Sequence, residues 1–219
     1  MYRIYLHRLA YSNLIYTFQG LFMATRRTPR FKECRHLGVN VCGHPKAMDR
    51  ANAPAFKHTK KISEYGKQLI EKQKVKAYYG ILERQLVQYY KRALKAEGKT
   101  GEALIEALEC RLDNLVYRIG FANSIRMARQ MVTHGHITVD GEKVNIPSYA
   151  VKVGQTISLI EKMRKSPQFK EQFASPNKVK YDYLERDEEN FSGKLISKPR
   201  REKIPVDIND QMVVEFYSK

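Results

Sequence analysis

The chain has few cysteines, no long apolar run and, over its first hundred residues, little acid. Three cysteines are an odd and low number, which argues against a disulfide scaffold and favours a reducing compartment. No apolar run approaches the ~20 residues that a membrane-spanning helix needs. Residues 1–100 hold 6 acidic residues against 21 Lys and Arg. The net charge of +17 is extreme for a cytosolic enzyme and favours a polyanionic partner, nucleic acid before an anionic membrane.

The sequence nevertheless has enough apolar residues to fold. With 42% hydrophobic residues in 219, it can form one large domain or two small ones. Residues 24–62 are basic, are punctuated by Pro and Gly, and show weak periodicity, so we expect this arm to order itself against a partner. Residues 1–22 lack acid and stand apart. They are either an organelle transit segment, or they come from a start codon chosen upstream of the true start, which would then be Met23.

Three helical patterns follow the basic arm. Residues 63–97 carry an apolar face, with Gly80 as the predicted division into two helices, and residues 100–119 continue a stripe of leucines until Gly120. Asn123 or Ser124 is a plausible cap for a third helix that continues to about Val132. Four tyrosines at helical spacing are expected to lie mostly in the core, namely Tyr78, Tyr79, Tyr89 and Tyr90.

Strand patterns begin after the third helix. His136–Asp140 alternates, Asp140-Gly141 is a turn sequence, and Lys143–Ile146 is the expected return strand. Residues 151–159 indicate further strand. A short helix is expected over Gln168–Phe173, and the alternation in residues 204–219 predicts a carboxyl-terminal strand. The predicted fold class is therefore α+β, mostly helical.

The helices and hairpin of residues 111–159 form a candidate RNA interface. Arg111 and Arg118 share one polar stripe, and Arg126 and Arg129 share another. Arg and Lys neutralise phosphates and release counterions. Such residues are usually an ordinary solvated face, but two acid-poor stripes that meet at a hairpin favour RNA binding. The full predicted RNA-binding set is Arg26, Arg27, Arg30, Lys32, Arg35, Lys46, Lys60, Lys61, Lys67, Lys72, Lys74, Lys76, Arg84, Arg111, Arg118, Arg126, Arg129, His134, His136 and Lys143.

Several long motifs resemble one family. RLDNLVYRIGF, ARQMV and HGHITVDGEKVNIPSYAVKVGQTI are similar to the alpha-L RNA-binding module. MATRRTPRFKECRHLGVN, SEYGKQLIEKQKVKAYYGILERQ and IPVDINDQMVVEFYSK extend the likeness to the bacterial-type ribosomal protein S4 family, over nearly all of residues 23–219. The resemblance implies a helical body with an inserted module. We expect an extension at 1–22, an arm and helical body at 23–110, the module at 111–175, and a carboxyl-terminal segment at 176–219 that packs on the body.

The resemblance also implies a function. The family binds 16S ribosomal RNA directly at a multi-helix junction, early in assembly of the small ribosomal subunit. It contacts neighbouring protein S5, lies near the mRNA entry path, and is linked to decoding accuracy. It has no catalytic activity, cofactor, small-molecule substrate or membrane partner. The expected location is the cytoplasmic small subunit, or an organellar one if residues 1–22 are a transit segment. The sequence departs from the family at Asn123 and Ile125, where Arg is common, and at Arg126, where a small residue is usual.

A possible metal site and two alternatives to a passive RNA-binding role remain to be weighed. Cys34, His36, Cys42 and His44 suggest zinc, but a C-x-H spacing is too tight for standard geometry, so we expect no metal. Arg111-Leu112-Asp113 resembles a motif of pseudouridine synthases that carry the same module, which would make Asp113 catalytic. We expect Asp113 instead to bond near a helix start or to pair with Arg. A membrane-surface role would depend on residues 1–22.

Overall fold

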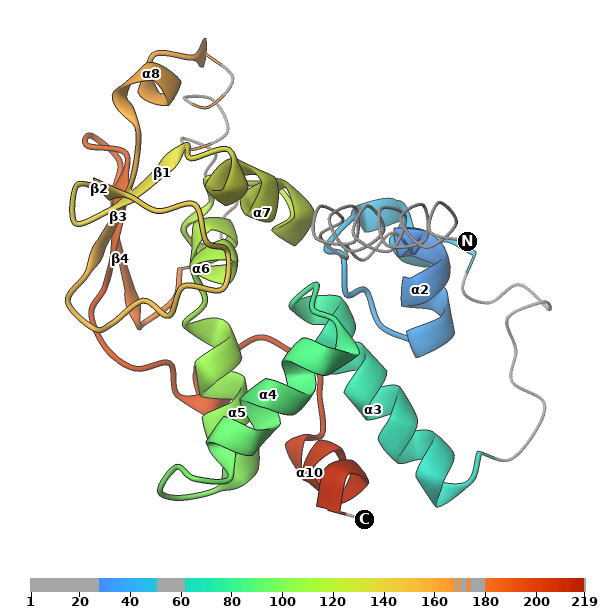
Figure 1. The fold of residues 1–219 in the computed structure, drawn as a ribbon. Helices are drawn as coiled ribbons and strands as arrows, with labels where there is room; N and C mark the ends of the chain where they lie inside the picture. Colours follow the sequence, from blue (N-terminus) through green and yellow to red (C-terminus); the bar gives the residue numbers. More distant parts are fainter. Residues whose placement is uncertain (1–27, 51–61, 168, 170–172, 174–179, 219) are drawn as a thin grey trace, which may run out of the picture.

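A computed structural model describes residues 28–50, 62–167, 169, 173 and 180–218 of the chain (Figure 1). It is an α+β structure, as predicted, in which helices predominate and one small antiparallel sheet lies at one side. The helices are α2 (Arg30–Leu37), η1 (Pro45–Met48), α3 (Glu64–Tyr78), α4 (Glu83–Ala93), α5 (Thr100–Glu109), α6 (Leu112–Ile119), α7 (Ile125–Thr133), α8 (Glu161–Arg164), η3 (Arg201–Lys203) and α10 (Asp210–Ser218). The strands are β1 (Ile137–Val139), β2 (Glu142–Lys143), β3 (Thr156–Leu159), β4 (Leu184–Asp187) and β5 (Ser192–Leu195).

Helices α3, α4, α5 and α10 form the body around one apolar core. Ser63 begins α3 because its hydroxyl accepts a hydrogen bond from the backbone N–H of Gly66, at 3.2 Å. Gly80, with φ +60°, separates α3 from α4 as predicted. Val75, Leu86 and Leu108 are fully buried where these helices meet.

Helices α6 and α7 pack against each other and against the sheet, around a second core. Gly120 ends α6 with φ +97°, and the Ser124 hydroxyl caps α7 by accepting from the N–H of Met127 at 3.3 Å. The chain then enters β1 and turns at Asp140-Gly141 into β2. The predicted succession of two helices and a hairpin is therefore confirmed. The return strand is shorter than expected, since β2 ends at Lys143 rather than at Ile146.

The strands are ordered β2-β1-β3-β5-β4, and every neighbouring pair is antiparallel. Helix α6 approaches the sheet closely at β5, where Gly193 lies under Ile119. A Cβ atom at Gly193 would lie 2.7 Å from Cδ1 of Ile119, so the contact requires glycine. Strands β4 and β5 lie beyond residue 175, the predicted end of the module, and still belong to its sheet.

The expectation for the end of the chain was wrong. The end of the chain forms helix α10 rather than a strand. The alternation of residues 213–217 also fits a helix that buries Val213 and turns Tyr217 towards Tyr90, with ring centroids 4.9 Å apart. The basic arm, whose periodicity is weak, contains one regular element, α2, which buries Cys34 and Leu37 and ends at Gly38 with φ +73°. The helix expected over Gln168–Phe173 lies largely outside the described residues.

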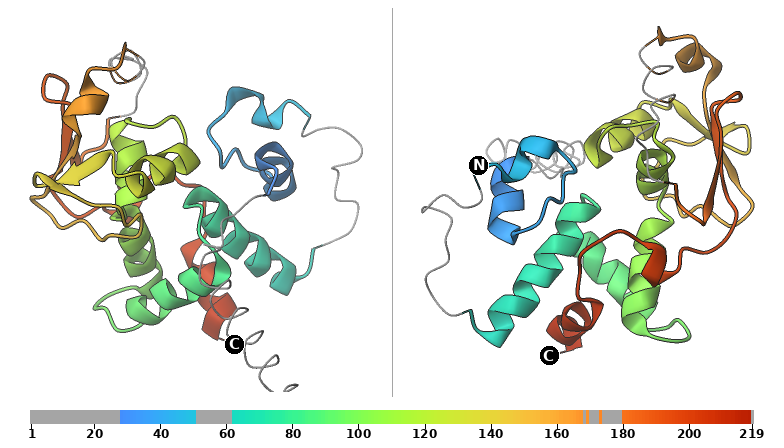
Figure 2. Two further views of the ribbon diagram at one scale, coloured as in Figure 1. Left: turned by 45° about the horizontal axis from the view of Figure 1, so that its top comes forward. Right: turned by 180° about the vertical axis from the view of Figure 1, so that it is seen from behind.

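Figures 1 and 2 show how the parts meet. Helix α5 leads from the body into α6, and α10 returns to lie beside α3 and α5. Helix α2 lies near the junction of α3 and α7, away from the sheet. Among the described helices, none is long and apolar enough to cross a membrane.

Candidate nucleic-acid interface

Two buried carboxylates hold the body and the α6–α7 unit together. The first is Glu109 at the end of α5, which is fully buried. It accepts hydrogen bonds from the hydroxyls of Tyr79, at 2.9 Å, and Tyr183, at 2.7 Å. It also pairs with Arg118 of α6, whose Nε lies 2.6 Å away. One side chain thus connects α3, α5, α6 and the segment before β4.

The electrostatics around Glu109 reflect this burial. Burial and the adjacent carboxylate both raise the pKa values of Tyr79 and Tyr183 above the ordinary tyrosine value, so both hydroxyls remain donors. Burial opposes the charge on Arg118, but attraction to Glu109 outweighs it and the pKa of Arg118 is raised. The Arg118 side chain is 9% exposed and is committed to this pair.

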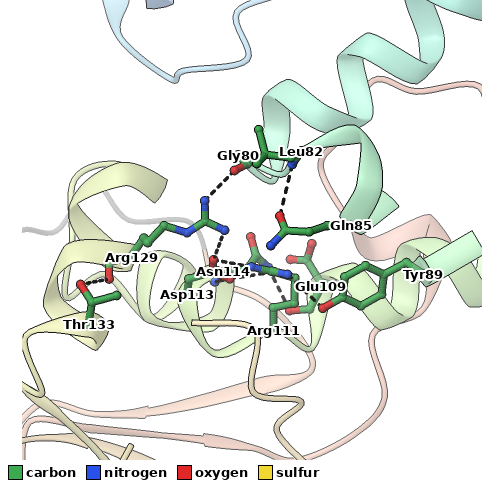
Figure 3. A network of polar contacts seen from close by, with 10 residues as sticks. All are labelled: Gly80, Leu82, Gln85, Tyr89, Glu109, Arg111, Asp113, Asn114, Arg129 and Thr133. Atoms are coloured by element: carbon green, nitrogen blue, oxygen red, sulfur yellow. Dashed lines mark hydrogen bonds and ion pairs between the residues drawn. The ribbon is translucent and has the colours of Figure 1, made fainter. Parts of the chain in front are cut away.

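The second buried carboxylate is Asp113, at the start of α6 (Figure 3). Arg111 binds it in bidentate fashion, with Nε to Oδ1 at 2.9 Å and NH2 to Oδ2 at 2.6 Å. Arg129 of α7 pairs with the same carboxylate at 3.1 Å and donates to the carbonyl oxygen of Gly80 at 2.7 Å. Arg111 also donates to the hydroxyl of Tyr89 at 2.9 Å. The network therefore joins α6 and α7 to the corner between α3 and α4.

These contacts show where the structure places two members of the predicted RNA-binding set, Arg111 and Arg118. The Arg111 side chain is 1% exposed and its guanidinium group is bonded to protein on both sides. Arg111 and Arg118 are thus both held in ion pairs inside the protein. The same contacts confirm the expectation that Asp113 bonds locally and pairs with Arg. Its carboxylate is fully buried, which leaves it no access to a substrate.

A cleft of about 470 Å³ opens above this network. Its walls come from α2, the loop that follows α2, the end of α3, and helices α6 and α7. Tyr78, Tyr117 and Ile125 supply apolar surface, and Arg30, Arg126 and Arg129 supply guanidinium groups. Arg126 reaches from α7 to the residues that precede α2, and its NH2 group donates a hydrogen bond to the carbonyl oxygen of Thr28 at 2.8 Å.

The predicted lysines of the body are mostly neutralised within the protein. Lys72 and Lys76 both pair with Glu83, at 3.1 and 2.9 Å. Lys74 pairs with Glu71, and Lys67 pairs with Glu64, each at 2.7 Å. Lys72 is also buried, and its ammonium group lies 4.1 Å from the ring centroid of Phe216. Because of these ion pairs, a large part of the positive charge of the body helices is balanced by nearby carboxylates.

A different set of cations has no acidic partner among the described residues. It lies on α2, η1, α4, the outer face of α7 and the hairpin. Its members from the predicted set are Arg30, Lys32, Lys46, Arg84, Arg126, His134, His136 and Lys143. Arg35 of α2 is half-buried, and Arg26, Arg27, Lys60 and Lys61 lie outside the described residues.

Two groups of basic residues are not part of the predicted RNA-binding set. Lys162 of α8 approaches His136, because β1 and β3 are paired and α8 follows β3 directly. Lys91, Arg92 and Lys95 line a shallow hollow at the end of α4. The second group could have been found from its helical spacing in an acid-poor stretch, whereas the first depends on strand pairing between distant segments.

The zinc candidates do not form a ligand set within the described part of the chain, where no group of three or more His, Cys, Asp and Glu is placed to hold a metal ion. Cys34 is buried, and burial, followed by a hydrogen bond with Cys42, raises the pKa of its thiol. His44 instead accepts a hydrogen bond from the N–H of Lys46 at 3.2 Å and lies against Phe31. His36 is exposed on α2.

Comparison with known families defines the class of protein first. Residues 25–109 match the family model for the ribosomal protein S4/S9 N-terminal domain, and residues 110–157 match the S4 domain. The first match covers the arm and the body helices α3, α4 and α5, and the second covers α6, α7 and the strands of the hairpin.

Curated relatives make the assignment specific. The chain is 50% identical to small ribosomal subunit protein uS4B of Clostridium acetobutylicum over 197 residues, 90% of this chain and 100% of that protein. It is 48% identical to uS4 of Finegoldia magna and 46% identical to uS4 of Geobacillus stearothermophilus, again over 90% of this chain and the whole of each relative. The chain therefore belongs to the bacterial-type uS4 family of small ribosomal subunit proteins. These relatives are ribosomal proteins, not enzymes, which confirms both the resemblance and the expectation that the chain is not an enzyme.

Proposed function

We propose that this protein is a structural constituent of the small ribosomal subunit that binds 16S ribosomal RNA directly. The observation that carries this proposal is the sorting of its cations. Lysines of the body and arginines of the interior are paired with carboxylates. The exposed cations of the predicted set along α2, the outer face of α7 and the hairpin have no acidic partner among the described residues and are therefore available to bind an external anion. A surface of this kind binds a phosphate backbone with an affinity that falls as salt rises.

The family membership supports a more detailed role. The RNA target would be a multi-helix junction, occupied early so that the body of the subunit assembles around it. The protein would contact neighbouring protein S5 and lie near the mRNA entry path, where its position would affect translational accuracy. In a bacterial cell the location would be the cytoplasmic small subunit.

The specificity would come from RNA shape. The two buried carboxylates fix α6 and α7 relative to the α3–α4 corner, so the surface cations are presented at set positions. Folded RNA is recognised largely through backbone contacts and shape, and such recognition needs a rigid protein surface. Arg30 and Arg126, on opposite sides of the cleft, would contact phosphates that flank it.

The test is filter binding of the full chain to 16S ribosomal RNA, with heparin of matched charge as competitor. We expect a strong preference for the RNA. Arg126→Gln should weaken RNA binding and reduce the slope of log K against log salt by about 1, as for the loss of one phosphate contact. Lys203→Gln, whose lysine pairs with Asp182 at 3.0 Å, is the matched control and should leave the slope unchanged. Equal binding of heparin and RNA would refute the proposal.

A further inference from the structure

A compact group of basic side chains lies at the carboxyl end of α7, where the chain enters the sheet. We call it the α7–β1 cluster. It consists of His134, His136, Lys143 and Lys162. His134 follows α7 as its cap, His136 precedes β1, Lys143 ends β2 and Lys162 lies on α8. Four separate elements of the fold therefore direct basic groups to one place.

The members of this cluster lie close to one another. The rings of His134 and His136 are 5.9 Å apart at their centroids. Between them Gly135 has φ +66°, and the stem of Lys143 crosses directly over it. A side chain at Gly135 would collide with Cε of Lys143, and its Cβ would lie 2.8 Å from the Lys143 ammonium nitrogen. The ammonium group of Lys143 thus lies against the residue that separates the two histidines.

The charges in the cluster have one sign. Burial, then the proximity of His134, Lys143 and Lys162, lowers the pKa of His136 below its ordinary value. Glu142 and Glu161 are next to the two lysines in sequence, but neither contributes to this shift. Glu161 pairs instead with Lys165 at 3.2 Å. In the protein alone, the His136 ring is therefore held in its neutral form to a lower pH than an ordinary histidine.

We propose that the α7–β1 cluster binds one backbone phosphate of RNA and that this binding is linked to uptake of a proton by His136. The inference rests on the proposed function, since it takes RNA as the partner. A phosphate diester carries one negative charge and oxygens that accept from both ammonium groups and from the ring N–H. Its arrival supplies the anion that the cluster lacks, so the cations no longer oppose protonation of His136.

Proton uptake on binding makes RNA affinity depend on pH. The free protein has its His136 pKa below the ordinary value, and the bound anion moves it upward, so affinity rises as pH falls through the interval between the two values. With one linked proton the steepest change is about tenfold per pH unit. We expect the wild type to bind 16S ribosomal RNA about five- to tenfold more tightly near pH 6 than near pH 7.5, at fixed salt.

Two substitutions at His136 test this directly. His136→Gln should reduce the pH dependence and should bind more weakly than the wild type near pH 6. His136→Lys, which carries a permanent charge, should bind near neutrality about as tightly as the wild type does at low pH. The matched control is His36→Gln on α2, an exposed histidine outside the cluster, which should retain the wild-type profile. Thermal unfolding of each variant checks that the fold is intact.

Calorimetry of the unmodified protein gives an independent measurement. Titration with the RNA in two buffers of different ionisation enthalpy counts the protons taken up, and we expect a substantial fraction of one proton near pH 6.5. Absence of proton uptake, or a His136→Gln profile identical to that of the wild type, would overturn the linkage. Lys143→Met with unchanged affinity would overturn the phosphate site. Failure of the wild type to prefer RNA over heparin at any pH would instead refute the proposed function.

Discussion

The Glu109–Arg118 pair makes the sharpest prediction about stability. Glu109→Gln keeps the shape of the side chain but removes its charge, which leaves the guanidinium group of Arg118 with 9% exposure and no counter-ion. Tyr79 and Tyr183 now donate to different oxygens of Glu109, and only one of these oxygens becomes an NH2 group, so one of the two hydroxyls meets a donor instead of an acceptor. Removing one partner of a buried ion pair typically costs about 3–5 kcal/mol. This is a large part of the ~5–15 kcal/mol that holds a domain folded.

Thermal and urea unfolding measure the effect. For a chain of this size, about 2–4 °C of Tm per kcal/mol predicts a decrease of roughly 6–20 °C. The informative control is the double variant Glu109→Gln with Arg118→Met, because it removes both charges and leaves no unpaired ion. It should recover at least half of the lost stability. A single variant within about 0.5 kcal/mol of the wild type would refute the reasoning, since it would mean that the buried carboxylate does not hold Arg118.

Three further substitutions test other parts of the structure. Asp113→Asn should lower the free energy of unfolding by about 3 kcal/mol in urea titration, because Arg111 loses its buried partner, and should leave ribosomal RNA modification unchanged. Gly193→Ala should cost about 1–3 kcal/mol by overpacking against Ile119, and adding Ile119→Val should restore part of it; an unchanged Tm would contradict the contact. Arg84→Gln, at an exposed site on α4, should lower the salt slope of RNA binding by about 1 without changing Tm, and an unchanged slope would remove Arg84 from the interface.

Local signals in the sequence were sufficient for most of the fold. Ser63, Gly80, Gly120 and Ser124 begin or end helices where caps and glycines indicated. The carboxyl-terminal helix was missed because a run such as MVVEF satisfies a period of two as well as a helical period. Asn209 carries the deciding signal: its side-chain oxygen accepts from the N–H of Met212 at 3.2 Å, which is the contact of a helix cap.

The interface was harder to predict because sequence shows which residues are cations but not which of them are paired. Arg111 and Arg126 look equivalent in the sequence, yet one is 1% exposed beside Asp113 and the other lies exposed at the cleft. Glu109 gave no signal at all, since its partners Tyr79, Arg118 and Tyr183 are 30, 9 and 74 residues away. Long-range pairing decides the role of each charge, and a one-dimensional pattern does not contain it.

The division of the cations into two populations has a physical reason. A surface that must fit folded RNA needs its helices held at fixed positions, and ion pairs that lie beneath the surface supply this because RNA cannot reach them to compete for the charges. Arg129 shows how the two populations meet: 25% of its side chain is exposed at the cleft, while its guanidinium group remains bound to Asp113 and to Gly80. Exposed charges such as Arg126 and Lys143 contribute little to folding, so they remain available to phosphates. The carboxylates that pair with the body lysines and the interior arginines therefore have two effects. They lower the net charge, and they determine where on the surface the unpaired positive charge lies.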